Sequence, residues 1–84
     1  MLQVWTNATD TAIAESAEDA IRVWCEATGE RLEDYAHQVD EWSTYPPTKV
    51  LTIQNFNGDN VTITRTCAEL IASEGRCYLC STEF

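Results

Sequence analysis

The residues that could do chemistry in this chain are four cysteines, one histidine and fourteen acids. Cys77 and Cys80 form a Cys-x-x-Cys pair in the tail segment GRCYLCSTEF. A thioredoxin-type site places such a pair at the N-terminus of a helix, where the helix dipole lowers the thiol pKa. Here only four residues follow Cys80, and both cysteines lie in a strand-like run. The pattern therefore argues against redox catalysis.

A structural zinc site is the second reading of the cysteines. It requires four ligands, which strong zinc sequences supply as two paired knuckles. This chain has one pair, and the other candidates, Cys25, Cys67 and His37, are single and sit in apolar or helical positions. On a strand, Cys77 and Cys80 would also point to opposite faces. We predict no metal and no cofactor, with Cys25 and Cys67 as reduced core residues, and keep a small zinc-binding structural or regulatory module as an alternative.

No catalytic constellation is recognisable among the remaining polar residues. His37 is the only histidine, and in an acidic helical segment it is more typical of a solvated side chain than of a base. The acid pairs Glu33/Asp34 and Asp40/Glu41 occupy adjacent positions, which do not face one another on a helix. The three glycines are far apart and form no phosphate-binding loop. We predict that the protein is not an enzyme.

Negative charge is concentrated in one half of the chain. The formal net charge is −9, and residues 10–41 contain ten acids and two arginines, a net charge of −8. Nucleic acid and anionic membranes both require a positive face, so direct binding to either is disfavoured. A basic surface on a protein or ribonucleoprotein partner is favoured, because the negative field would steer its approach.

The spacing of the acids suggests how such a partner would be bound. Acids three to four residues apart on a helix are separated by about 5–6 Å of rise, on the scale of the roughly 3.4 Å between phosphates of a DNA strand. A row of carboxylates along one helix and its continuation could thus occupy a groove made for a phosphate backbone. Trp42 and Tyr45, beside Pro46-Pro47, are predicted as exposed aromatic anchors, with packing over the sheet edge as the alternative. The predicted partner-binding residues are Glu15, Glu18, Asp19, Glu26, Glu30, Glu33, Asp34, Asp40, Glu41, Trp42 and Tyr45.

The first half of the chain predicts the elements that carry these acids. Residues 1–6 alternate as a short strand with Leu2 and Val4 on one face, and residues 7–15 are polar and turn-like. Ser16, followed by Asp19, resembles a capping box for a helix over residues 17–28, which has one apolar stripe and Gly29 as its left-handed C-cap. Residues 30–42 have the spacing of a second, shorter helical segment.

The second half predicts a hairpin, a helix and a strand. Pro46-Pro47 makes residues 43–48 an extended link. Residues 49–56 and 60–66 alternate as two strands joined by Asn57-Gly58-Asp59, with Leu51, Ile53, Val61 and Ile63 on the buried face. Thr66-Cys67-Ala68-Glu69 is a capping box that starts a helix of about two turns, which ends before Gly75. Residues 76–82 form a last strand.

The chain is therefore predicted as one α+β domain, residues 1–84, in the order β-α-(α)-β-β-α-β. A three- to four-stranded, mainly antiparallel sheet packs against one longer and one short helix, an order compatible with a ferredoxin-like arrangement. The segment MLQVWTNATDTAIAES has no basic region and no long apolar run. We expect no signal peptide, no membrane span and a cytoplasmic location.

Two segments, EDAIRVWCEATGE and TCAELIASEGRCYLCSTEF, resemble small acidic proteins encoded by phages and prophages, a group that includes anti-CRISPR proteins. The resemblance covers about half of the chain and concerns structural rather than catalytic motifs. It implies an inhibitor of a host CRISPR-Cas effector complex of the Cascade type, acting in the bacterial cytoplasm. We predict a monomer or a weak homodimer. Its acidic surface would imitate DNA and block recognition of the target. A protein-interaction subunit that uses an aromatic patch remains the further alternative.

Overall fold

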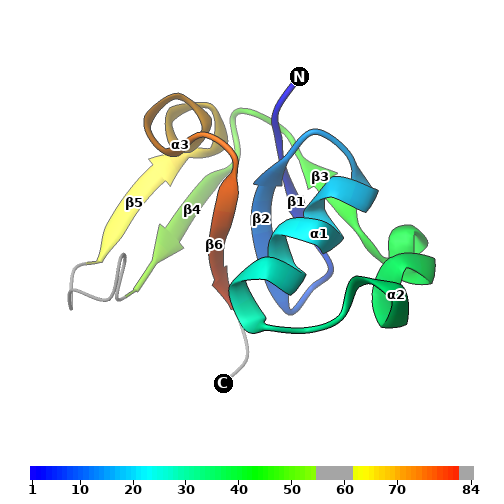
Figure 1. Ribbon diagram of the computed structural model, residues 1–84. Coiled ribbons are helices and arrows are strands. Elements are labelled where there is room, and N and C mark those ends of the chain that lie inside the picture. Colours follow the sequence, from blue (N-terminus) through cyan, green and yellow to red (C-terminus); the bar gives the residue numbers. More distant parts are fainter. Residues whose placement is uncertain (55–61, 82–84) are drawn as a thin grey trace.

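The predicted α+β class is confirmed by the computed structural model, which describes residues 1–54 and 62–81, the last two by their backbone alone. Its described part contains an antiparallel four-stranded sheet, a separate two-stranded hairpin and three α-helices (Figure 1). Within these described residues, no helix is long and apolar enough to span a membrane.

The four-stranded sheet is built around an N-terminal hairpin. Strand β1 (Gln3–Thr6) pairs with β2 (Asp10–Ala14), and both neighbours that extend the sheet come from distant parts of the chain. Strand β3 (Ser43–Tyr45) pairs with β1, and β6 (Cys77–Ser81) pairs with β2, so the strand order is β3-β1-β2-β6 with all pairs antiparallel. Because β1 and β2 form a hairpin and strands 4 and 5 lie in another sheet, the arrangement is not ferredoxin-like.

Strand β2 corrects the prediction of a polar turn over residues 7–15. All five of its residues are buried, because both faces of the sheet are covered. Ala12 and Ala14 belong to a first core cluster under helix α1 (Ala17–Thr28), whereas Ile13 belongs to a second cluster on the opposite face. A strand covered on both faces has no polar alternation to reveal it. Strand β3 likewise corrects the prediction that the segment before Pro46 is only a link.

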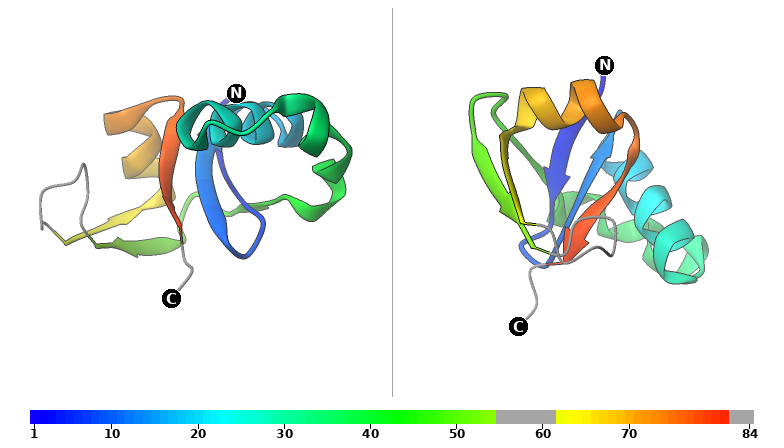
Figure 2. Two further views of the ribbon diagram at one scale, coloured as in Figure 1. Left: turned by 60° about the horizontal axis from the view of Figure 1, so that its bottom comes forward. Right: turned by 90° about the vertical axis from the view of Figure 1, so that its left-hand side faces the viewer.

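Helix α1 has the predicted bounds, because local residues encode both of its ends. The Ser16 hydroxyl accepts a hydrogen bond from the backbone N–H of Asp19, and Gly29 ends the helix in the left-handed conformation at φ 79°. Only glycine adopts that conformation without steric cost. Ala20 and Ile21 are buried against the sheet, and the small alanines of β2 leave room for the helix to lie across it (Figure 2).

The second core cluster lies beneath the β4–β5 hairpin and helix α3. Strands β4 (Val50–Ile53) and β5 (Ile63–Thr66) confirm the predicted hairpin, although its turn at residues 57–59 and Val61 lie outside the described residues. Ile53 is buried, as predicted for the inner face, and Leu51 and Ile63 are half-buried. The reciprocal capping box predicted at Thr66 starts helix α3 (Cys67–Glu74). Buried residues of the hairpin and helix pack against β1 and β2: Ile53, Cys67 and Leu70 against Val4 and Ile13.

A candidate acidic interface

Eight of the ten acids in residues 10–41 have exposed side chains, and they lie on helix α1, in the segment that follows it and, for Glu15, just before the helix. Asp10 is an exception, because it is buried in β2 and accepts a hydrogen bond from the Tyr78 hydroxyl at 2.8 Å. Asp19 is the other, with its carboxylate 15% exposed. The exposed acids are Glu15, Glu18, Glu26, Glu30, Glu33, Asp34, Asp40 and Glu41.

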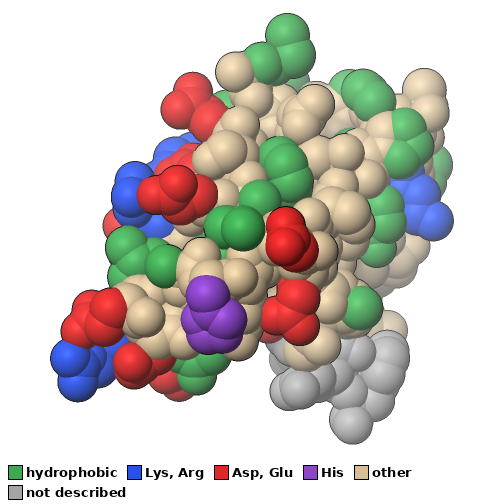
Figure 3. Space-filling model, turned by 90° about the vertical axis from the view of Figure 1, so that its right-hand side faces the viewer, with side chains coloured by type: hydrophobic (Ala, Val, Ile, Leu, Met, Phe, Trp, Pro, Cys, Tyr) green, Lys and Arg blue, Asp and Glu red, His purple; other side chains and the backbone are tan. Residues whose placement is uncertain are grey.

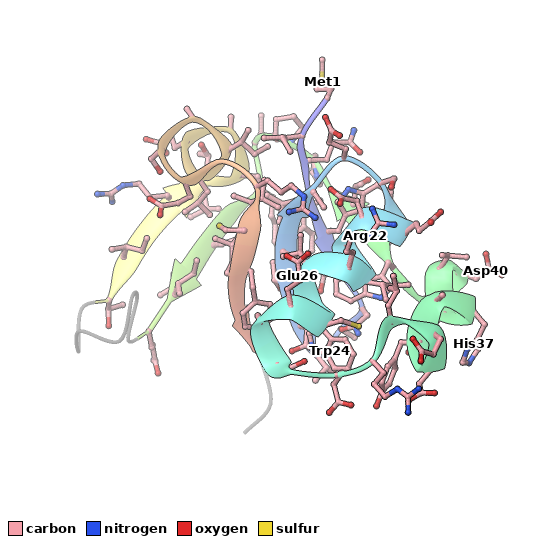
Figure 4. All side chains as sticks on the ribbon, viewed as in Figure 1. Met1, Arg22, Trp24, Glu26, His37 and Asp40 are labelled. Carbon is pink, nitrogen blue, oxygen red and sulfur yellow. The ribbon has the colours of Figure 1, made fainter. Side chains whose placement is uncertain are left out.

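The segment after α1 contains helix α2 (Leu32–Tyr35) and the 3₁₀ segment η1 (Ala36–Glu41). The segment is held by apolar side chains on its inner side: Leu32, Tyr35 and Val39 pack against the first core cluster. The Tyr35 ring meets Trp24 of α1 edge-on, with ring centroids 4.7 Å apart. The outer side is polar, and His37 and Asp40 project from it away from the sheet (Figure 4). The short helical segment predicted here is therefore confirmed as two short pieces.

Trp42 is a core residue rather than an exposed anchor. It is 6% exposed and belongs to the first core cluster, where it fixes the end of η1 to the sheet. The prediction that Trp42 presents an aromatic contact surface is wrong, because the chain turns inward before β3. Tyr45 is half-buried against the second core cluster, and the Lys49 ammonium lies over its ring, 5.6 Å from the centroid. Because Trp42 is buried and Tyr45 is half-buried, these two aromatic side chains do not form an exposed contact surface.

The acids of α1 are largely compensated by arginines. Arg76, just before β6, donates from Nη2 and Nε to both carboxylate oxygens of Asp19 at 2.8–3.1 Å, and its Nη1 lies 3.9 Å from Glu26. These hydrogen bonds lower the pKa of the Asp19 carboxyl despite its partial burial, and the backbone N–H of Glu15 lowers it further. Arg22 lies 3.7 Å from Glu18, one helical turn away. Figure 4 shows Arg22 and Glu26 on the same helix.

The ion pair with Arg76 gives Asp19 a structural role. The sequence predicts Asp19 as a partner-binding acid and as part of a capping box, and its carboxylate instead joins α1 to Arg76 just before β6 and to the backbone of Glu15 just after β2. Arg76 carries no sequence signal for this role, because 57 positions separate it from Asp19. Asp19 is therefore largely withdrawn from any interface that uses the exposed acids.

The acids of residues 30–41 are less compensated. Glu33 accepts a hydrogen bond from Arg31 Nε at 3.1 Å, and Glu30 accepts a longer one from the Tyr35 hydroxyl at 3.3 Å. This segment holds five acids and one arginine, a net charge of −4 in twelve residues. Among the described residues, five exposed acids have no cationic group within 4.0 Å: Glu15, Glu30, Asp34, Asp40 and Glu41.

The geometry does not provide one straight row of carboxylates. Helix α1 ends at Thr28, Gly29 reverses the chain direction locally, and the remaining acids lie on α2 and η1. The expectation that acids follow a single helix and its continuation at phosphate-like intervals is therefore wrong. Figure 3 shows instead that acidic side chains lie on different sides of the single histidine, separated by neutral surface.

The negative charges of this surface affect the pKa values of two neighbouring side chains, Tyr35 and Cys25. The pKa of the Tyr35 hydroxyl is raised, chiefly by the nearby charge of Glu30. The pKa of the Cys25 thiol is raised by burial and, to a lesser degree, by Glu30 and Asp34. Both shifts have the sign expected when negative charges oppose the formation of another anion.

The described cysteines occupy separate parts of the core. Cys25 lies in the first cluster and Cys67 in the second, both buried as predicted, and Cys77 is half-buried at the edge of the second. Burial raises the pKa of all three thiols, which disfavours the reactive thiolate form. Among the described side chains, no group of three or more cysteines, histidines or acids could hold a metal ion. The Cys80 side chain lies outside that description.

Comparison of the chain with protein-family models, with curated proteins and with solved structures finds no significant match. The proposed binding mode therefore depends on the charge and geometry of the surface formed by α1, α2 and η1, and the proposed class of target depends only on the sequence resemblance described above.

Proposed function

We propose that this protein is an inhibitor that binds a basic, nucleic-acid-binding surface of another protein through the exposed acids of α1, α2 and η1. One observation carries the proposal: eight exposed acids lie on these elements or directly beside them, and five of the eight have no cation within 4.0 Å among the described residues. A Lys/Arg-lined groove supplies the charges that this surface lacks.

The charge arrangement is costly for the fold taken alone. Residues 30–41 contain five acids and one arginine, and this excess of like charge is repulsive in the absence of a partner. The surrounding contacts nevertheless hold the segment in place through Leu32, Tyr35 and Val39. A fixed acidic surface loses less conformational entropy on binding than a flexible acidic tail would.

The distribution of ion pairs supports a larger contribution from some of these acids than from others. Glu18, Asp19 and Glu26 already have arginine partners, so a basic ligand gains less from them. Asp34, Asp40 and Glu41 are exposed and have no such partner among the described residues. We place the centre of the interface at α2 and η1, with the acids of α1 contributing to the long-range field.

The resemblance to small acidic phage proteins supplies the class of target. The proposed partner is a CRISPR-Cas effector complex of the Cascade type, whose DNA-binding surfaces are basic, in the cytoplasm of a bacterial host. Occupation of that surface would exclude target DNA by competition, since the complex cannot bind both anions at one site. This mode of action needs no catalytic residue and no cofactor.

A competition experiment with two matched variants tests the proposal. The first variant combines Asp34→Asn, Asp40→Asn and Glu41→Gln, which removes three negative charges from the proposed centre. The control combines Gln3→Lys, Ala72→Lys and Glu74→Gln, which changes the net charge equally at exposed positions on β1 and α3. Each protein is titrated against a guide-loaded Cascade-type complex and a labelled target duplex, and the bound duplex is measured.

The wild type and the control should displace the duplex, and the α2–η1 variant should require a roughly 10- to 100-fold higher concentration. That range corresponds to about 0.5–1 kcal/mol for each of three interfacial charges. Equal displacement by all three folded proteins would rule out the acids of α2 and η1 as the binding centre. Failure of the wild type to displace DNA from any Cascade-type complex would reject the proposed target class.

A further inference from the structure

We draw no further inference here: the strongest candidate, the rim of half-buried apolar residues that surrounds the second core cluster at the β4–β5 hairpin, helix α3 and strand β6, carries nothing because nothing in the structure shows what covers it.

Discussion

Ala8 adopts a backbone conformation that alanine disfavours. Its φ of 79° lies in the left-handed region, and no other non-glycine residue of the described chain has a positive φ. The turn that joins β1 to β2 imposes it: the Asn7 side-chain oxygen accepts hydrogen bonds from the backbone N–H groups of Thr9 and Asp10. The β1–β2 hairpin, and with it the buried strand β2, is therefore made at the cost of a strained alanine.

We expect Ala8→Gly to stabilise the protein by about 0.5–1 kcal/mol, because glycine removes the Cβ clash at positive φ. Urea denaturation measures the change. Ala27→Gly is the matched control, since Ala27 is exposed within helix α1 and the same substitution there should destabilise by a similar amount. A decrease in stability for both variants would show that the turn does not impose strain at Ala8.

Substitutions of Trp42 distinguish a structural role of this side chain from a role in partner binding. Because its side chain is 6% exposed in the first core cluster, Trp42→Ala should cost about 3–5 kcal/mol of unfolding free energy. That loss is a large part of the stability of a small domain. Trp42→Phe, which keeps an aromatic ring, should cost less. A Trp42→Ala protein of unchanged stability that no longer binds its partner would instead identify Trp42 as an exposed anchor.

At the scale of elements, Asp19 and Arg76 join three parts of the fold that meet above the sheet. The carboxylate belongs to the first turn of α1, accepts a hydrogen bond from the backbone N–H of Glu15 just after β2, and pairs with Arg76 just before β6. A bidentate pair with the carboxylate 15% exposed is stronger than an ordinary surface ion pair, although the arginine, at 39%, is partly screened by water.

We expect Asp19→Asn to destabilise the protein by about 1–2 kcal/mol, since an ion pair with two hydrogen bonds becomes a weaker hydrogen bond from the charged guanidinium to a neutral amide. Arg76→Gln should cost about the same, and the double variant should cost clearly less than the two together. Strictly additive losses would mean that the two side chains do not interact in solution. Glu18→Gln, whose pair with Arg22 is exposed on both sides, provides a control with a smaller effect.

The Asp19–Arg76 pair should make the free energy of unfolding depend on pH in the acidic range. The pKa of the Asp19 carboxyl is lowered in the folded state from an ordinary value of 3.8, so the folded protein binds this proton less readily than the unfolded chain. The stabilisation is therefore present above pH 3.8 and is lost as pH falls through the lower, folded-state pKa. Chemical denaturation below about pH 4 should show the wild type losing its advantage over Asp19→Asn.

Elements with local signals were predictable from the sequence, and those defined by distant contacts were not. Ser16, Gly29 and Thr66 act within one turn of their helices, so both ends of α1 and the start of α3 were correctly predicted. Strand β2 was not predicted, because both of its faces are buried and its sequence therefore lacks polar alternation. Strand β3 was not predicted either, because the three residues before Pro46 form a strand only through their pairing with β1.

The candidate interface was only partly predictable, for the same reason. Composition predicts that acids are concentrated in residues 10–41, and eight of these acids are indeed exposed. Asp19 is unavailable to a partner because it pairs with Arg76, and Trp42 is buried because it packs in the first core cluster with residues of α1 and the sheet. Neither contact has a signature in the local sequence.

At the scale of the whole molecule, opposite ends of the fold differ in charge. Residues 15–41 have a strong excess of acids, whereas near the hairpin Lys49 and Arg65 are balanced by Glu69 and Glu74 of α3. Such an asymmetric field orients an approaching basic surface toward the acidic elements and accelerates association. Because exposed charges produce it, dissolved salt should weaken it over a Debye length of about 10 Å at 0.1 M ionic strength.

The most direct test is the salt dependence of binding to a guide-loaded Cascade-type complex, measured for the wild type, the α2–η1 variant (Asp34→Asn, Asp40→Asn, Glu41→Gln) and the matched control. Between about 0.05 and 0.3 M salt, the dissociation constant of the wild type and of the control should rise at least tenfold, because screening removes the attraction. The α2–η1 variant should bind more weakly at low salt and depend less on salt. A dissociation constant that is the same for all three proteins and independent of salt would contradict the proposal that these acids bind a basic surface.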